Sequence, residues 1–557
     1  MIYKIADNVL SPLGETTAEN YQAVKAGRSA LCRYDYHWGL PESFTASLFS
    51  EEQQERLAID GLTRFESLAV RSASDAIQRS GIDVTNPRVI FILSSTKGNI
   101  ELLADGEDVS MGTAACRIAH YLGFVTEPLV VCNACISGVS AIIAALRLLE
   151  AGHYDYAVVC GADVQSPFTV SGFQSLKAVA EDACRPFDIE RLGLNLGEAA
   201  ATIVFSNSLA LCPVPLAPKI WSVAKGAVRN DAYHISTPSK DGEGARLTLQ
   251  QILQGVATDD LAFVNAHGTA TMYNDQMESK AIERAGLGDV PVNALKGYFG
   301  HTLGAAGILE TIISMAAVDD HTILATKGFE EIGVSGKIRL SAEHQPTDNQ
   351  CFVKMISGFG GGNAALLLKR VGLEDDSHPF SAEQSVALRI PLAPCPMPLA
   401  SNSSLTTLYK EKIGDYPKYY KMDGLSRLGF VASELLLGDQ HQKCAIILFN
   451  RSSSIDADRK YLATIAADNY FPSPSVFVYT LPNIVTGEIA IRHHWKSETS
   501  FYILPKRDDA FIQQMAEASL ADEETKCVLT GWLDYEDDTH YEADLWLVSK
   551  NENVKMK

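Results

Sequence analysis

Strand and helix patterns alternate along the chain up to residue 371, and this alternation restricts the possible folds more than any other feature. Short apolar runs at residues 89–93, 157–160 and 200–205 have the composition of buried strands. Helical spacing of apolar residues lies between and after them, for example at residues 62–79 and 302–318. Such alternation is typical of mainly parallel sheets covered by helices. We therefore predict an α/β fold.

The last part of the chain repeats the first in degenerate form. Four segments recur in the same order, and the pairs are 60–65 with 423–428, 90–95 with 446–451, 133–138 with 482–487, and 157–161 with 527–531. The shared order favours a duplicated half-domain, with chance similarity between α/β segments as the alternative. In this alignment Ile484 stands at the place of Cys135. The copy is therefore expected to have lost any chemistry centred on that cysteine.

The composition changes after Gly372. An acidic stretch is followed by four prolines within residues 391–398, which is typical of a connector that lies over a surface. The predicted units are a first domain at 1–371, with halves at about 1–215 and 216–371, a linker at 372–405, and a degenerate half-domain at 406–557.

Cys135 lies on a predicted turn between a strand and a helix. The apolar run 128–131 precedes it, and an alanine- and leucine-rich helix over 142–149 follows. The free N–H groups and the dipole of a helix N-terminus favour a thiolate and can bind a developing oxyanion. Cys135 is therefore a candidate nucleophile, and a buried structural cysteine is the alternative.

Two histidines downstream stand in small-residue contexts. His267 follows the predicted strand 261–265 in the segment HGTAT, at the sheet edge where α/β folds bind ligands. A histidine whose hydrogen bonds are satisfied within a turn is the alternative. His301 lies in KGYFGHTLGAAG at the start of the predicted helix 302–318, where the dipole disfavours protonation. Lys296 and Glu310 are predicted to pair and hold this loop, although a solvated surface pair is also possible.

The charge and the cysteines exclude some classes of function. The net charge of -21 argues against a general nucleic-acid binder. The 11 cysteines show no paired CxxC motif and no metal-ligand spacing, as expected for free thiols in a reducing cytosol. The first residues lack the apolar core of a signal peptide, and no apolar run is long enough to cross a membrane. We therefore expect a cytoplasmic protein.

Taken together, the motifs resemble the β-ketoacyl-acyl carrier protein synthases of the Cys-His-His type. The resemblance covers residues 1–371 and rests on the turn around Cys135, HGTAT, KGYFGHTLGAAG, GFGGGNA at 358–364 and the opening SPLG at 11–14. It implies a thiolase-like layered αβαβα fold of two duplicated halves, to which the predicted half-domain adds a third. That half-domain is also similar to short, truncated synthase-like proteins of bacterial pigment and polyene clusters, which implies a secondary-metabolite setting.

The resemblance implies an acyltransferase that condenses an acyl thioester with malonyl-acyl carrier protein and releases carbon dioxide. Cys135 would carry the acyl group, and His267 and His301 would stabilise the enolate. The N–H groups of Cys135 and Phe359 would form the oxyanion hole, with Phe359 also gating the acyl pocket. Thr269 and Thr271 would contact the phosphopantetheine arm. The implied partners are acyl carrier protein and a second synthase-like subunit, identical or different, and no metal or other cofactor is expected.

Other functions remain open at this point. A coenzyme A-dependent thiolase would carry a second catalytic cysteine, but the corresponding segment reads SGFG at 357–360. A Cys-His-Asn synthase would have asparagine in place of His301. A non-catalytic partner that sets chain length would typically lack Cys135. Leu194 replaces the phenylalanine that is common near the gate in the family, so acyl selectivity is not predicted.

Overall fold

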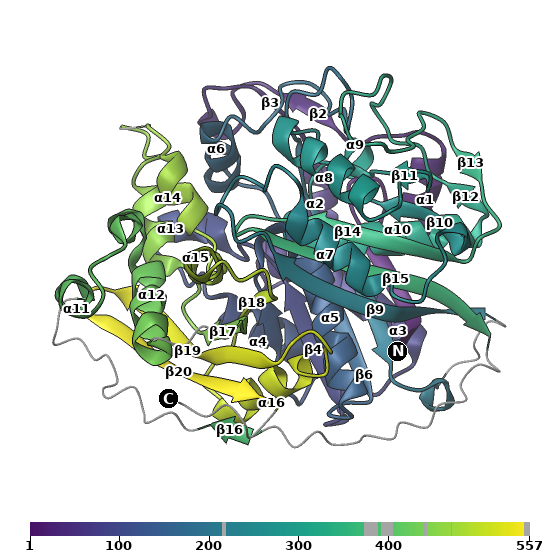
Figure 1. The fold of residues 1–557 in the computed structure, drawn as a ribbon. Helices are drawn as coiled ribbons and strands as arrows, with labels where there is room; N and C mark the ends of the chain where they lie inside the picture. Colours follow the sequence, from purple (N-terminus) through teal and green to yellow (C-terminus); the bar gives the residue numbers. More distant parts are fainter. Residues whose placement is uncertain (214–218, 373–387, 391–404, 439–442, 469, 551–557) are drawn as a thin grey trace.

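Among the residues that the structure describes, one large mixed sheet of 15 strands is accompanied by two small sheets of two and three strands. The computed structural model describes residues 1–213, 219–372, 388–390, 405–438, 443–468 and 470–550. Helices cover the sheet on both sides (Figure 1). Within the described residues, no helix has the length and apolar character needed to span a membrane. The strands of the large sheet fall into three successive groups of five.

The first group comes from the N-terminal part of the chain. Its order is β1 (Ile2–Leu10), β8 (Ala199–Ser206), β6 (Tyr156–Asp163), β4 (Val89–Ser94) and β5 (Leu129–Val131). β4 is parallel to both β5 and β6. All six residues of β4 are buried, because helices pack on both of its faces. This explains why the strand reads as a continuous apolar run rather than an alternating one.

The second group continues from β1, which pairs with β9. Its order is β9 (Lys219–Asn230), β15 (Gly362–Gly372), β14 (Cys351–Ser357), β10 (Leu261–Asn265) and β11 (Val292–Asn293). β10 has the bounds that the sequence predicts. The carboxyl end of β10 leads directly to His267.

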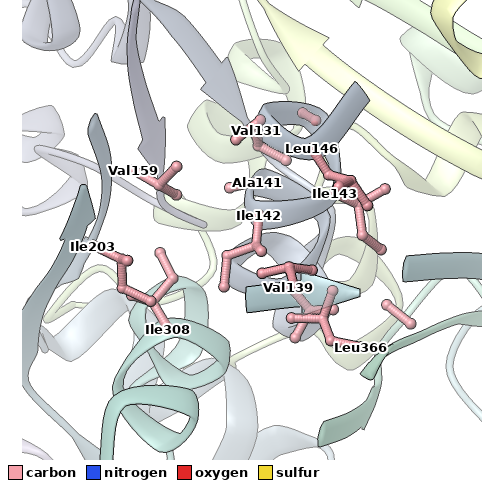
Figure 2. Packing of buried hydrophobic residues seen from close by; sticks show 14 of the residues in the cluster. Val131, Val139, Ala141, Ile142, Ile143, Leu146, Val159, Ile203, Ile308 and Leu366 are labelled. Atoms are coloured by element: carbon pink, nitrogen blue, oxygen red, sulfur yellow. The ribbon is translucent and has the colours of Figure 1, made fainter. Parts of the chain in front are cut away.

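Two apolar helices form the middle layer of the fold. α5 (Ser137–Glu150) and α10 (Ala306–Asp319) are buried along most of their length. Figure 2 shows Val139, Ile142 and Leu146 of α5 packed among side chains from the surrounding strands and from α10. A Cβ on Gly138 would lie 2.9 Å from the carbonyl oxygen of Gly304. Glycine at this position is therefore what allows the two segments to approach so closely.

The third group extends the same sheet beyond β5. Its order is β18 (Thr499–Ile503), β17 (Ala445–Asn450), β19 (Cys527–Asp537), β20 (His540–Ser549) and β16 (Leu388–Ile390). β18 runs antiparallel to β5, with Tyr502 opposite Val131 and Ile503 opposite Val130. β5 is therefore hydrogen-bonded on both sides and has no free edge. Most of the predicted linker lies outside the described residues, except for β16, which pairs with β20.

The third group repeats the strand order of the first. β18, β17, β19 and β20 follow one another as β5, β4, β6 and β8 do. The helix α12 (Gly424–Leu437) precedes β17 as α3 (Arg64–Ser80) precedes β4. Three of the four sequence pairs therefore fall on equivalent elements.

The fourth pair, 133–138 with 482–487, is wrong. Residues 484–487 begin α15 (Ile484–His493), which comes before β18, whereas residues 133–138 follow β5. In both units the next helix begins six residues after the strand ends, at Ser137 and at Asp509 in α16 (Asp509–Ser519). Arg507, rather than Ile484, therefore stands at the place of Cys135. The run 475–480 contains β-branched and aromatic residues that favour a strand, but it lies mainly in the helix α14 (Pro474–Tyr479).

Candidate active site

Three loops from two groups of strands bring Cys135, His267 and His301 together. Cys135 lies in the short helix η3 (Ala134–Ile136) between β5 and α5. His267 follows β10, and His301 lies between α9 (Lys296–Phe299) and η6 (Leu303–Ala305). One ligand-type atom from each of the three side chains lies within 4.8 Å of the other two. The sequence-predicted nucleophile and both histidines therefore share one site.

Burial dominates the acid–base behaviour of the cysteine. It raises the pKa of the Cys135 thiol to about 12, and the nearby ammonium of Lys296 offsets only part of this effect. Burial therefore opposes the stabilisation of the thiolate that the sequence predicts for a helix N-terminus. The thiol is neutral near pH 7, so its attack on a thioester requires a base to accept the proton.

The two imidazoles are suited to act as neutral groups. Their rings meet edge to face, with centroids 4.9 Å apart. Burial, followed by the positive charge of Lys296, lowers the pKa of both His267 and His301 well below 6.5. The predicted helix 302–318 is observed as η6 (Leu303–Ala305) followed directly by α10, so His301 precedes its first turn. Both rings are uncharged near pH 7.

A backbone hydrogen bond sets the orientation of His301. The N–H of Leu303 donates to Nδ1 of His301 over 3.3 Å. Nδ1 must accept this bond, so the ring proton lies on Nε2. Nε2 is buried and has no hydrogen-bond partner among the residues that the structure describes. It is therefore available to donate to an oxygen atom that gains charge.

The loop after β10 is held by acidic side chains that sequence reasoning missed. The backbone N–H groups of His267 and Gly268 donate to the two oxygens of Glu278, over 2.7 and 2.8 Å. Asp275 accepts from the N–H of Ala270 over 3.1 Å. Both carboxyl groups lie in the predominantly polar helix α8 (Met272–Arg284), yet both are buried. Their position soon after the histidine loop was the sequence signal that could have predicted this role.

Lys296 and Glu310 form a buried network with a second lysine. Lys296 Nζ lies 2.7 Å from Glu310 Oε1, and Lys354 Nζ donates to Glu310 Oε2. All three side chains are at most 3% exposed, which rules out a solvated surface pair. Burial would raise the pKa of Glu310, but the two ammonium groups outweigh it and hold the pKa below its usual value.

Lys354 is the member of this network that the sequence analysis missed. It lies in β14, every residue of which is buried, and it also donates to Asn265 Oδ1 over 2.7 Å. Burial lowers the pKa of Lys354 to about 8. A single charge inside the apolar run FVKMIS was the signal, because such a charge is rarely buried without a partner.

We expect a Lys354→Met substitution to change both stability and pH dependence. Loss of one partner from a buried ion network costs about 3–5 kcal/mol. Lys354 also helps to lower the pKa of both histidines, so its loss should raise those pKa values. Activity that needs neutral imidazoles should stay constant in the unaltered protein as the pH falls through 6.5. On acidification, the variant should lose this activity at a less acidic pH than the unaltered protein does.

Thermal unfolding measures the loss of stability, and the pH profile of activity measures the rise in the histidine pKa values. Lys369→Met is the matched control, because Lys369 lies on the neighbouring strand β15 and is exposed. If Lys354→Met and the unaltered protein lost activity at the same acidic pH, the proposed effect of Lys354 on the pKa of the two histidines would be contradicted.

Phe359 lies between the cysteine and the third group of elements. Its ring stacks with that of Phe173 at 6.1 Å, and its carbonyl oxygen accepts from Asn483 Nδ2 over 2.9 Å. A Cβ on Gly358 would lie 3.2 Å from the backbone nitrogen of Cys135. The loop thus reaches the nucleophile on one side and α15 on the other. Its roles in gating and in the oxyanion hole stay predictions.

A cavity of about 350 Å³ leads to the three candidate catalytic residues. Thr269 and Thr271 line it, with their hydroxyl oxygens 2.9 Å apart. Leu194 also lines this cavity and packs in one buried cluster with Phe173. The role of the two threonines in contacting a phosphopantetheine arm stays a prediction.

The same thiol and imidazoles are a donor set of a type that Zn²⁺ accepts. The expectation that the protein uses no metal therefore stays a prediction.

Comparisons with known proteins cover both the motifs and the fold. The family profile described as "Beta-ketoacyl synthase, N-terminal domain" matches residues 11–209, and "Beta-ketoacyl synthase, C-terminal domain" matches 221–330. A 3-oxoacyl-[acyl-carrier-protein] synthase 2 from Vibrio cholerae is 26% identical, over 65% of this chain and 97% of that protein. The ketoacyl synthase alpha subunit of the tetracenomycin polyketide synthase from Streptomyces glaucescens is 30% identical, over 65% of this chain and 95% of its own length.

Solved structures extend the comparison to the third group. A β-ketoacyl synthase from Burkholderia phymatum is 25% identical, with a TM-score of 0.59, over 66% of this chain and 99% of that one. The structure titled "PfaC Keto synthase-Chain length factor" aligns over 100% of this chain and 79% of its own, with a TM-score of 0.76 and 13% identity. The predicted thiolase-like fold with an added α/β unit is confirmed.

Proposed function

Because the chain belongs to the beta-ketoacyl synthase family, we propose that it condenses an acyl thioester with malonyl-acyl carrier protein to give β-ketoacyl-acyl carrier protein. The observation that carries this proposal is the placement of one thiol and two neutral imidazoles within 4.8 Å in a cavity. A non-catalytic role in setting chain length would not need this arrangement. A thiolase role lacks support, because Gly358 and Phe359, rather than a second cysteine, face the nucleophile.

The first half-reaction transfers the acyl group to the cysteine. The neutral thiol of Cys135 attacks the thioester carbon while an adjacent imidazole accepts its proton. The carrier thiol leaves and takes up a proton. The acyl group is then held as a thioester on Sγ.

The second half-reaction uses the histidines as hydrogen-bond donors. As the malonyl carboxylate leaves as carbon dioxide, negative charge develops on the malonyl thioester oxygen. Nε2–H of His301 can donate to that oxygen, and the absence of competing partners preorganises it for this task. The resulting carbanion attacks the acyl-cysteine, and the Cys135 sulfur leaves and is protonated again.

A loading and condensation assay with the unaltered protein tests this proposal. Intact-protein mass should increase by one acyl group on incubation with acyl-carrier protein thioesters. Subsequent addition of malonyl-carrier protein should remove that mass and give a β-ketoacyl product with release of carbon dioxide. A protein that never carries an acyl group would contradict the proposal, as would condensation with acetyl-coenzyme A in place of the malonyl thioester.

We also propose that residues 406–557 act structurally, in the place that a second subunit takes in related synthases. Several contacts support this role. β18 completes the sheet next to β5, and Asn133 Oδ1 beside the nucleophile accepts from the N–H of Phe501 over 2.6 Å. Arg147 of α5 lies 2.6 Å from Glu498, with both side chains at most 9% exposed. One related structure is described as a ketosynthase in complex with its chain length factor, and residues 406–557 would supply a comparable second part within one chain.

A chain truncated after Val371 is expected to aggregate or to pair through its exposed β5 edge. Removal of the third group also takes away the Glu498 partner of Arg147 and exposes this side chain to water together with the β5 edge. Sedimentation and thermal unfolding of the two chains measure the effect. A truncated chain with the same assembly, melting temperature and products as the full chain would contradict the structural role.

A further inference from the structure

Cys135 borders two spaces of very different size. One is the cavity of about 350 Å³ described above, and the other has a volume of about 20 Å³. Phe173 and Phe359 line both spaces, whereas Phe477 and Leu481 of the third group line the smaller one. The smaller space has room for about one water molecule. Because the larger cavity would be occupied by the thioester arm, an acyl chain of several carbons on Cys135 requires the wall of the smaller space to move.

Of the aromatic rings in this wall, that of Phe359 is the least constrained by secondary structure. Phe173 lies in α6 (Pro167–Ser175) and Phe477 in α14, so both of these rings are carried by helices. Phe359 lies instead in the turn between β14 and β15 and is only half-buried. Gly360, the next residue, has a φ of +87°, a conformation that glycine adopts at little cost. A movement that enlarges the smaller space is therefore expected at Phe359.

A side chain of the third group holds the backbone of this turn. The carbonyl oxygen of Phe359 accepts from Asn483 Nδ2 over 2.9 Å, and this is the one hydrogen bond that Phe359 makes among the residues that the structure describes. Asn483 is 5% exposed, so water can hardly compete for this bond. A Cβ on Gly360 would lie 2.6 Å from the same Nδ2, so the amide lies directly against the turn. With the turn held in this way, the Phe359 ring stacks on that of Phe173 and the smaller space stays closed.

The way in which Asn483 uses its amide is unusual for its place in the chain. Asn483 is the N-cap residue of α15, where an asparagine commonly accepts a hydrogen bond from a backbone N–H of the first turn. Its side chain makes no such bond here, and Oδ1 is buried without a partner among the described residues. A buried acceptor that is left unpaired is unfavourable. The contact with Phe359, rather than support of α15, therefore explains how this side chain is placed.

We propose that Asn483 is a positioning residue of the third group, which holds Phe359 in the closed position and must release it before a long acyl chain loads onto Cys135. This inference rests on the proposed function, because it concerns how Cys135 is acylated. It assigns the third group a part in the reaction beyond completing the sheet. A purely structural role, in which the same hydrogen bond only joins the two units, is the competing account.

The first test compares acetyl and octanoyl pantetheine thioesters as acyl donors for the unaltered protein and for Asn483→Leu. Leucine keeps the branched shape of the side chain but has no N–H. Octanoyl loading should become about three- to tenfold faster, because one net hydrogen bond no longer opposes opening of the turn. Acetyl loading should keep its rate, because a methyl group needs little additional room. The initial rate of Cys135 acylation is followed by intact-protein mass.

The results of this comparison separate the two proposals. An octanoyl rate that is unchanged or lower in folded Asn483→Leu would overturn this inference while leaving the proposed function intact. An equal change for both donors would indicate a purely structural role and would overturn it as well. Failure of the unaltered protein to load either donor would overturn both proposals. Asn483→Asp, which keeps the size of the side chain and also lacks the N–H, gives the same test if the leucine variant does not fold.

Two further variants separate the positioning role from general support. Phe359→Ala removes the ring that closes the space, and in this background Asn483→Leu should have no further effect on octanoyl loading. Asn207→Leu is the matched control, because Asn207 Nδ2 also donates to a backbone carbonyl oxygen, that of Tyr154 over 3.2 Å, and Asn207 lines neither space at Cys135. It should leave the ratio of octanoyl to acetyl loading at the parent value. If the effect of Asn483→Leu persists without the Phe359 ring, or if Asn207→Leu shifts the ratio as strongly, Asn483 does not act through Phe359.

Discussion

A Cys135→Ala variant is expected to lose acyl loading completely while still decarboxylating malonyl-carrier protein. The covalent intermediate requires the sulfur, and alanine cannot form a thioester. His267 and His301 keep their positions, because their backbone contacts with Glu278 and Asn195 do not involve Cys135. Decarboxylation needs only a donor aimed at the malonyl thioester oxygen. Mass spectrometry of the protein and release of labelled carbon dioxide measure the two activities separately.

Cys116→Ala is the matched control for this experiment. Cys116 is a free, half-buried cysteine in α4 (Met111–Leu122), and it does not line the cavity that holds Cys135. It should load and condense at the rate of the unaltered protein. Condensation retained by Cys135→Ala would remove Cys135 from the mechanism.

His267→Ala and His301→Ala are each expected to load an acyl group and then to stall. Loading should survive because the donors that stabilise the enolate act only in the second half-reaction. Condensation should fall about a hundred- to a thousand-fold, which is the typical cost of removing one donor aimed at developing charge. Single-turnover measurement, in which the acylated protein is isolated before malonyl-carrier protein is added, resolves the two steps.

The double variant extends this prediction. With neither imidazole present, the thiol has lost both neighbouring bases, so loading should slow as well. His321→Ala is the control, because the His321 side chain is 62% exposed and does not line the cavity that holds Cys135. If either single variant condenses at the parent rate, that histidine does not stabilise the enolate.

Much of the fold follows from local pattern. β4 and β10 are mainly apolar runs because both faces of the sheet are covered, and α5 is largely apolar because it is buried along most of its length. Such segments can be recognised without coordinates. The candidate site could also be predicted from the sequence, since glycine and alanine around Cys135, His267 and His301 mark places where the backbone must approach closely. The equivalence of the first and third units could be recognised from the sequence where the aligned segments are strands, as for β4 and β17.

The misplaced alignment of residues 482–487 has a physical reason. Its small and hydroxyl-bearing residues mimic the turn after β5, but here they allow α15 to approach the loop at Phe359, and a Cβ on Gly487 would lie 2.5 Å from the carbonyl oxygen of Gly360. Close packing selects small residues whether or not chemistry occurs nearby. The true counterpart of the turn carries Arg507, which pairs with acidic residues at the surface.

By itself, the sequence determined the class of fold, the candidate nucleophile and the two candidate histidines, because periodicity and small-residue turns are local properties. Only the tertiary structure decided the state of these groups. The raised pKa of Cys135 and the lowered pKa values of both histidines arise from burial among segments that are distant in the chain. The pairing of β18 with β5 and the hydrogen bond from Asn483 to Phe359 are likewise contacts across long separations. Desolvation and pairing depend on what surrounds a residue in space, which no local pattern records.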